Sequence, residues 1–185
     1  MLAHIFANCI EHKEIKPPFL AMVVSGGHTE LVQFDTLVSF QIVGKTLDDA
    51  AGESFDKTAK LLGLGFPGGP IIDDLAKNGN PDFIRFPRAL PQKDNFNFSY
   101  SGLKTAIRTW LVNQKPEILN DKLPDIAASV QQAIIEPLVN KSVLWARQHK
   151  IPYILLAGGV AANSALRKQV TQSAAKYGIK VFYPS

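Results

Sequence analysis

The first half of the chain alternates apolar and polar positions in a way that predicts three strands between two helices. A helical pattern covers residues 2–13 and stops before Pro17-Pro18. Strands are expected at 19–25, 29–35 and 40–45. Their connections are so short that the strands must be antiparallel neighbours. From Asp48 to Leu62 the apolar period becomes helical, and the segment 63–70, rich in glycine and proline, ends that helix.

The second half predicts a polar excursion followed by a strand, a helix and a strand. Residues 78–101 are rich in Pro, Asn and charged side chains and have no sustained period, which indicates a long loop. Helices are expected at 102–113 and 123–149, and Pro137 should kink the second because proline lacks the backbone donor. A buried strand at 153–157, a helix over about 161–177 and a strand from Lys180 to Tyr183 complete the pattern.

This order predicts an α/β layered domain. Three antiparallel strands, a helix, a helical excursion and then strand, helix and strand are also the layout of one lobe of the actin-like, ribonuclease-H-like fold. In that fold, two such lobes enclose a nucleotide. The order of the elements therefore gives a first indication that the chain binds a nucleotide.

Composition excludes several classes of protein. The chain has 185 residues, 46% hydrophobic and 19% charged, which is typical of a globular protein rather than a disordered one. Its apolar runs are far shorter than the roughly 20 residues of a membrane span. Cys9 is the single cysteine, and the N-terminus lacks the pattern of a secretory signal. We therefore expect a reducing, cytoplasmic location and no contact with membranes.

The charge balance permits contact with nucleic acid without requiring it. The formal net charge is +4, and the basic residues occur in small groups rather than in one block. One group is Arg85, Arg88 and Lys93, in the polar excursion. We expect these three side chains to contact RNA phosphates if the protein acts on RNA; otherwise they are ordinary surface charges.

Two pairs of glycines follow apolar strands and are the strongest candidates for ligand contact. The first lies in the run from Val23 to Thr29, where Gly26 and Gly27 would let backbone N–H groups approach a phosphate or carboxylate. A plain hairpin turn is the alternative. The second pair follows the strand at 153–157 and leads to Asn163, which could recognise a ribose or a base edge. The alternative for Asn163 is a helix N-cap.

A third candidate is the acidic run from Asp48 to Lys57. Asp49, Glu53 and Asp56 share one helical face, so their repulsion must be relieved by a cation, a hydroxyl or a lysine. Lys57 and Lys60 could simply supply that charge. The glycines at 63, 65 and 68 match a dinucleotide-binding spacing, but they follow a helix rather than a strand, so we reject that interpretation.

Taken together and in this order, these runs resemble the tRNA N6-adenosine threonylcarbamoyltransferase family. The matching stretches are Val23 to Thr29, Leu47 to Pro70, Phe98 to Thr105 and Ala157 to Arg167. The resemblance implies an actin-like, two-lobed fold. It also implies transfer of a threonylcarbamoyl group from its adenylate to N6 of the adenosine 3′ of the anticodon.

The resemblance assigns ligand-binding roles, but no catalytic residue, to this chain. Val23, Val24, Ser25, Gly26 and Gly27 would cradle the acyl-phosphate, Asp56 and Gly69 would hold the ribose or nucleoside, and Asn163 would meet the nucleotide from the other side. The ligand would be threonylcarbamoyl-adenylate or ATP. In the family, one divalent metal, iron or zinc, polarises the acyl group. Its partners would be tRNA, an actin-like paralogue and a small ATPase.

The chain departs from the family at the metal ligands. The family's histidine pair should immediately precede the Leu2-Ala3 run, and its aspartate should follow Ser185. We therefore expect a fragment without metal ligands that is inactive alone. Residues 1–16 would be a linking helix and 17–185 the second lobe, with an insertion at about 78–150. The alternatives are a non-catalytic actin-like paralogue that serves as a binding partner, or a lobe of an actin-like ATPase or sugar kinase.

Overall fold

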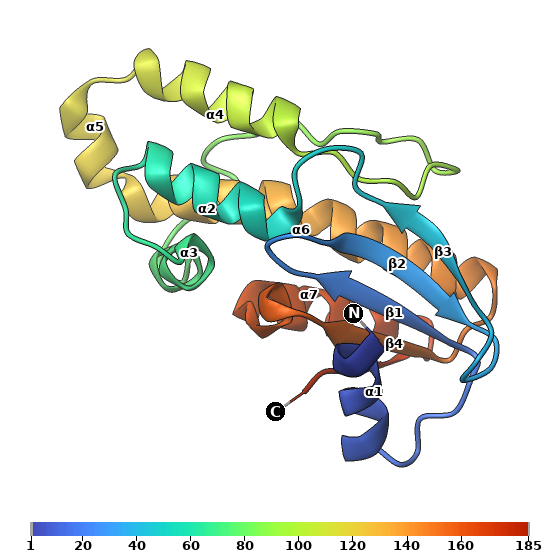
Figure 1. The fold of residues 1–185 in the computed structure, drawn as a ribbon. Helices are drawn as coiled ribbons and strands as arrows, with labels where there is room; N and C mark the ends of the chain where they lie inside the picture. The colour runs from blue at the N-terminus through green and yellow to red at the C-terminus, as the bar shows by residue number, and fades with distance from the viewer. Residues whose placement is uncertain (1, 185) are drawn as a thin grey trace.

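A mixed five-stranded sheet organises the molecule, with helices on both faces (Figure 1). The structure is a computed structural model and describes residues 2–184. The strands are β1 (Phe19–Val24), β2 (Thr29–Phe34), β3 (Phe40–Lys45), β4 (Tyr153–Ala157) and β5 (Lys180–Phe182). The helices are α1 (Leu2–Glu11), α2 (Ala51–Leu61), α3 (Gly68–Ala76), α4 (Ser101–Val112), α5 (Pro116–Asp121), α6 (Leu123–Gln148) and α7 (Ser164–Ala175), with a 3₁₀ turn, η1, at Gly159–Ala162.

The strand order is β3-β2-β1-β4-β5. β2 pairs antiparallel with both β1 and β3, and β4 pairs parallel with both β1 and β5. The antiparallel meander and the terminal strand, helix and strand are therefore confirmed. In the central parallel pair, Val23 lies opposite Ala157. The glycine pairs that follow β1 and β4 consequently leave the sheet at the same edge.

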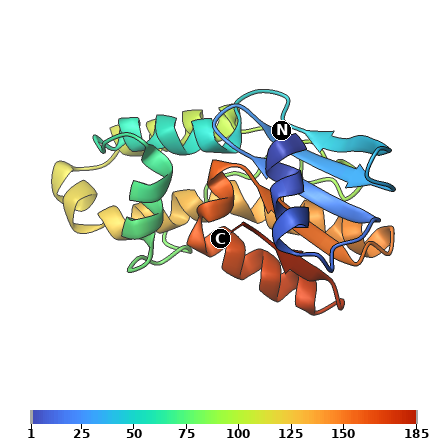
Figure 2. The ribbon, with the colours of Figure 1, turned by 60° about the horizontal axis from the view of Figure 1, so that its bottom comes forward.

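The centre of the sheet is buried on both faces, which explains why β1 is apolar throughout. Its even-numbered residues, from Leu20 to Val24, pack in the larger core with α2, α6 and α7. Its odd-numbered residues, from Phe19 to Val23, pack in a smaller core that includes Ile5 of α1. Figure 2 shows α1 crossing that second face. The N-terminal helix is thus part of the packed structure.

Several elements differ from the sequence expectation. α3 and α5 were not expected, and α2 begins at Ala51 rather than Asp48. The helix expected over 161–177 starts at Ser164, because Asn163 accepts a hydrogen bond from the backbone N–H of Leu166 and so caps α7. α6 continues as a helix through Pro137. Residues 77–100 form the expected long, largely irregular segment. Within the part of the chain that the structure describes, no helix is long and apolar enough to cross a membrane.

The close approach of α3 to α6 depends on Gly79, just beyond α3. A Cβ at this position would lie 2.0 Å from the backbone oxygen of Pro124. We expect Gly79→Ala to lower the free energy of unfolding by about 1–3 kcal/mol, because backbone must move to admit the methyl group. Chemical denaturation measures this. The control is Gly102→Ala in α4, where a Cβ meets nothing within 4 Å, and which should be neutral or slightly stabilising. Equal stability of the two variants would contradict the packing described here.

Candidate functional site

A cleft of about 460 Å³ lies where β1 and β4 end. Four segments form its walls: the β1–β2 turn, α2, α3 and the η1 turn before α7. Four of the residues that the sequence singled out line it together: Gly26, Asp56, Gly69 and Asn163. They come from four separate segments, so only the tertiary fold brings them together.

The β1–β2 turn is closed by Ser25. Its backbone N–H donates to the carbonyl of His28 at 2.8 Å, and its Oγ accepts from the backbone N–H of His28 at 3.0 Å. Gly26 and Gly27 are exposed, and a Cβ on either would meet no protein atom within 4 Å. Packing does not require glycine at these two positions. The space beside them is open to a ligand.

The turn is held against the start of α2. The backbone N–H of Gly52 donates to the carbonyl of Ser25 at 3.1 Å, and a Cβ on Gly52 would lie 2.6 Å from that same oxygen. Thr29 Oγ1 accepts from the backbone N–H of Ala51 at 2.8 Å. Val23 and Val24 are buried in β1 and do not line the cleft. Their observed role is to anchor the turn; the family-based expectation that they contact ligand stays a prediction.

Asp56 of α2 caps the start of α3 and lines the cleft. Its Oδ1 accepts from the backbone N–H of Gly68 at 2.7 Å. Among the described residues, no hydrogen-bond donor meets its second oxygen, Oδ2. Gly69 is the next residue of α3, where a Cβ would meet nothing within 4 Å. This part of the cleft therefore offers the second oxygen of a fixed carboxylate, Asp56 Oδ2, beside open backbone, an arrangement that suits a ribose hydroxyl.

Asn163 has a structural role at the opposite wall. Its side-chain oxygen caps α7, and its Nδ2 donates to Oε1 of Gln131 in α6 at 2.7 Å. The residue is 8% exposed. The N-cap alternative is therefore what the structure shows for the side chain, which ties α6 to α7 at the cleft. A direct contact with nucleotide stays a prediction.

Sequence reasoning missed the residues that α3 contributes to the rim. Asp73 accepts from the backbone N–H of Ser164 at 3.0 Å and from its hydroxyl at 2.8 Å, which joins α3 to the start of α7. Asp74 pairs with Lys77 at 3.0 Å. Asp73, Asp74 and Lys77 also line the cleft. The missed signal was Pro70 in a first helical turn, followed by apolar residues at helical spacing.

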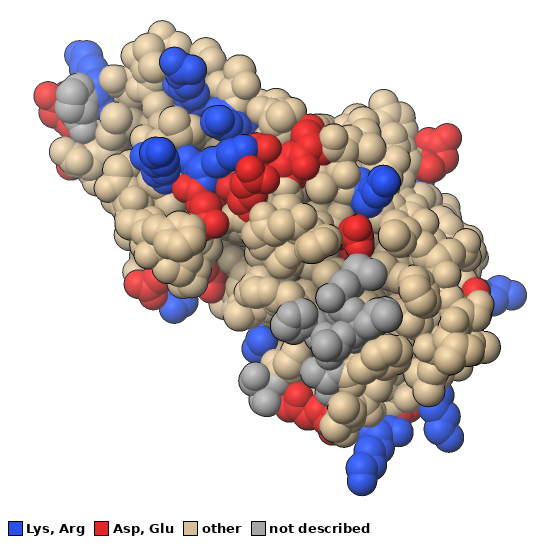
Figure 3. Space-filling model, viewed as in Figure 1, with Lys and Arg blue, Asp and Glu red and all other residues tan. Residues whose placement is uncertain are grey.

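Two carboxylates of the acidic run at 48–57 are neutralised by lysine. Lys57 Nζ lies 2.7 Å from Asp49 Oδ1 and 2.9 Å from Glu53 Oε1. Figure 3 shows basic and acidic side chains side by side over α2 and α4. Asp56 is not part of this ion-pair group. The simpler of the two sequence interpretations, charge compensation by lysine, is confirmed for Lys57.

Asp48 connects the β3–α2 loop to the start of α4. Its carboxylate accepts from the hydroxyls of Ser99 and Ser101 and from the backbone N–H groups of Tyr100 and Ser101. Partial burial raises the pKa of this carboxyl, but the hydrogen bonds outweigh that effect, so the net pKa lies below its ordinary value. A short side chain thus fixes a segment some fifty residues away.

The side chains that the structure describes do not form a metal site by themselves. No group of three His, Cys, Asp or Glu side chains among the described residues is arranged to hold a metal ion. The donor set that a divalent metal needs is therefore not met by this part of the chain.

The mixed sheet and the cleft at the ends of its parallel pair define one lobe of an actin-like α/β fold. Solved structures agree. Full-length HypF in its phosphate- and nucleotide-bound form superposes with a TM-score of 0.69 at 14% identity, covering 98% of this chain and 38% of that one. Component A of (R)-2-hydroxyglutaryl-CoA dehydratase from Acidaminococcus fermentans gives 0.57 at 15% identity, covering 98% and 60%. At these identities the likeness shows the fold alone.

The family follows from the sequence comparisons. The family model for tRNA N6-adenosine threonylcarbamoyltransferase matches residues 1–185, and the chain belongs to this family. The enzyme of that name from Syntrophotalea carbinolica is 50% identical over 185 residues, all of this chain and 54% of its own length. That from Chlorobaculum tepidum is 48% identical, covering 99% and 55%. The resemblance is confirmed, and the chain spans about half the length of these relatives.

The hydrogen bonds of Asp48 predict a pH-dependent stability. Because its pKa is lowered in the folded state, its contribution is present above the unfolded pKa of about 3.9 and is lost as the pH falls through the folded value. We expect Asp48→Asn to cost about 1 kcal/mol at pH 7, a value reduced by its exposure, and less at pH 3. Urea denaturation at both pH values measures the difference.

The matched control is Asp82→Asn. Asp82 is exposed, and its carboxylate accepts no hydrogen bond among the described residues. Its substitution should change stability little at either pH. A deficit of Asp48→Asn that is as large at pH 3 as at pH 7 would show that the carboxylate charge is not what holds α4.

Proposed function

We propose that the intact protein transfers a threonylcarbamoyl group from threonylcarbamoyl-adenylate to N6 of the adenosine 3′ of the anticodon of tRNA, and that this chain supplies the nucleotide-binding side of the site. The observation that carries the proposal is the convergence of Gly26, Asp56, Gly69 and Asn163 on one cleft, in a chain of this family.

The shape and charge of the cleft fit an adenylate better than a nucleoside triphosphate. Three carboxylates line it, from Asp56, Asp73 and Asp74, against one lysine, Lys77. Each phosphate group added to a ligand therefore increases repulsion from the walls. A single phosphate can be met by the open backbone of the β1–β2 turn, while Asp56 Oδ2 accepts from the ribose. We therefore favour the adenylate over ATP as the ligand.

The reaction itself is an acyl transfer. The N6 amine of adenosine attacks the carbonyl carbon of the carbamoyl–phosphate anhydride, the bond from that carbon to the phosphate oxygen breaks, and AMP leaves with the electron pair. The attacking nitrogen loses one proton. The part assigned to this chain is to bind and orient the adenylate, so that the nucleophile meets a fixed carbonyl.

The same proposal includes the substrate, the location and the partners of the intact protein. The substrate is tRNA, the protein acts in the cytoplasm, and its partners are an actin-like paralogue and a small ATPase. Residues 1–16 would lead from a first lobe, and 17–185 would form the second. The family's divalent metal, iron or zinc, would be held by residues outside those described here.

Gly27 provides the direct test of the cleft. Gly27 is the exposed neighbour of Gly26, which lines the cleft, and a Cβ at Gly27 would meet no protein atom within 4 Å. The N–H of Gly27 already donates to Ser25 Oγ at 3.3 Å, so the N–H that Gly27→Val would shield is that of Gly26. We expect AMP binding to weaken at least tenfold with the fold intact. Amide NMR titration with AMP and with ATP, following Gly26, Gly69 and Asn163, measures both affinities.

Gly102→Val is the matched control, since a Cβ at Gly102 also meets no atom within 4 Å but the residue lies in α4, away from the β1–β2 turn. It should bind AMP as the unaltered chain does. If Gly27→Val shows undiminished shifts at the cleft residues, the β1–β2 turn is not the phosphate cradle. If ATP binds more tightly than AMP, the assignment of an adenylate ligand is wrong.

A further inference from the structure

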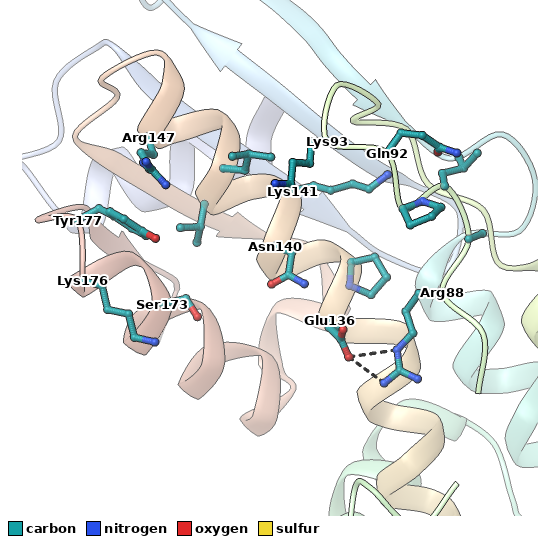
Figure 4. A pocket seen from close by; sticks show the side chains of 16 residues that line it. Arg88, Gln92, Lys93, Glu136, Asn140, Lys141, Arg147, Ser173, Lys176 and Tyr177 are labelled. Atoms are coloured by element: carbon teal, nitrogen blue, oxygen red, sulfur yellow. Dashed lines mark hydrogen bonds and ion pairs between the residues drawn. The ribbon is translucent and has the colours of Figure 1, made fainter. Parts of the chain in front are cut away.

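A second hollow, of about 560 Å³, lies away from the nucleotide cleft. It is bounded by the C-terminal half of α6, the end of α7 and residues 88–93 of the long irregular segment (Figure 4). None of its lining residues lines the cleft. α7 begins at the cleft and ends at the hollow, so the two are separated by about 20 Å, at 1.5 Å per helical residue.

The hollow is strongly cationic. Five basic side chains line it, against the single carboxylate of Glu136; the five are Arg88, Lys93, Lys141, Arg147 and Lys176. Together with Glu136, the five basic residues carry a net charge of +4, which equals the formal charge of the whole chain. The remaining positive and negative charges therefore balance, and the excess positive charge of the chain is concentrated on this surface. Such a concentration attracts a polyanion.

The basic side chains are not all equally available. Arg88 donates to Glu136 Oε2 through Nε and Nη2 at 3.1 and 2.8 Å, as the dashed lines in Figure 4 mark. Arg147 lies over the ring of Tyr177. Lys93 and Lys176 are exposed and form no ion pair among the described residues. These two lysines are the cations freest to meet an anion.

Lys141 adds a largely buried positive charge to the wall of the hollow. It is only 8% exposed, its ammonium donates to the carbonyl of Asn97, and it lies over the ring of Phe98, 5.5 Å from the centroid. Burial lowers the pKa of this amine. An anion in the hollow would offset the desolvation of this charge.

The geometry favours a phosphodiester chain over a small, isolated phosphate. Compact phosphate sites use backbone N–H groups at helix N-termini. The hollow instead lies at the C-terminal ends of α6 and α7, where the last carbonyls carry partial negative charge. Attraction comes only from side chains on long stems, distributed over three segments. That arrangement is typical of surfaces that follow a nucleic-acid backbone without reading its sequence.

We propose that the hollow between α6, α7 and residues 88–93 is a docking surface for the phosphodiester backbone of RNA. The inference rests on the proposed function, which supplies tRNA as the substrate. It revises the expectation from sequence, because Arg85 does not line the hollow and Arg88 is paired with Glu136. Lys141 of α6 and Lys176, which follows α7, line the hollow but were not in the expected basic group.

The test is the salt dependence of tRNA binding by the double variant Lys93→Gln/Lys176→Gln. Two lost phosphate contacts should reduce the slope of log K against log salt by about 1.5, at 0.7–0.9 per contact. Fluorescence anisotropy with labelled, unmodified tRNA between 50 and 200 mM KCl measures it. Both lysines are exposed and unpaired, so the melting temperature should be unchanged, which circular dichroism checks.

The matched control is Lys13→Gln/Lys16→Gln, which removes the same charge from exposed lysines between α1 and β1. Its slope should stay close to that of the unaltered chain. The proposal is overturned if the control loses as much slope as the test variant, if the test variant loses none, or if the unaltered chain fails to bind tRNA at 50 mM salt. Stoichiometric displacement of bound tRNA by millimolar inorganic phosphate would instead identify a small-anion site.

AMP titration separates this inference from the proposed function. Both lysines lie outside the cleft, so the Lys93→Gln/Lys176→Gln variant should bind AMP normally. If Gly27→Val loses AMP binding but the lysine variant keeps its salt slope, the cleft is the nucleotide site and the RNA-docking proposal is wrong. If Gly27→Val binds AMP normally but the lysine variant loses slope, the RNA-docking proposal holds and only the adenylate assignment is wrong.

Discussion

The parallel pairing of β1 with β4 is the constraint from which the site follows. These strands come from opposite ends of the chain, and their register puts Val23 beside Ala157. Each of the two strands is apolar and buried in the middle of the sheet. Neighbouring strands hydrogen-bond the backbone groups of each strand, and the side chains pack in the two cores. A shift of register would separate the two glycine pairs and remove the cleft.

Carboxylates then join the walls of the cleft to one another. Asp56 bonds the backbone N–H of Gly68, and Asp73 bonds that of Ser164, so α2 is tied to α3 and α3 to α7. Hydrogen bonds to a charged acceptor are stronger than those between neutral groups. A negative charge is also favourable at a helix N-terminus. The same acidic residues that discourage a polyphosphate ligand therefore also build the site. Binding and architecture share these side chains.

The sequence was sufficient for features with local causes. Alternation and tight turns identified the three antiparallel strands, and apolar runs ending in glycine pairs identified the edge where the cleft lies. The sequence did not predict contacts between residues that lie far apart in the chain. Asp48 belongs to the expected helix by its pattern, yet it bonds Ser99 and Tyr100, and α2 starts only at Ala51. No window along the chain contains that information.

The unbroken course of α6 has a mechanical consequence. The helix carries Gln131, bonded to Asn163 beside the cleft, and Arg147 at the second hollow. Sixteen residues at 1.5 Å each set these positions about 24 Å apart. A helix resists stretching because its backbone hydrogen bonds hold the rise of each residue, so the separation does not depend on loop conformation. Bending is easiest at Pro137, between the two, where a backbone donor is missing. Because Pro137 itself lines the hollow, this compliance is located at the end of the hollow nearer the cleft.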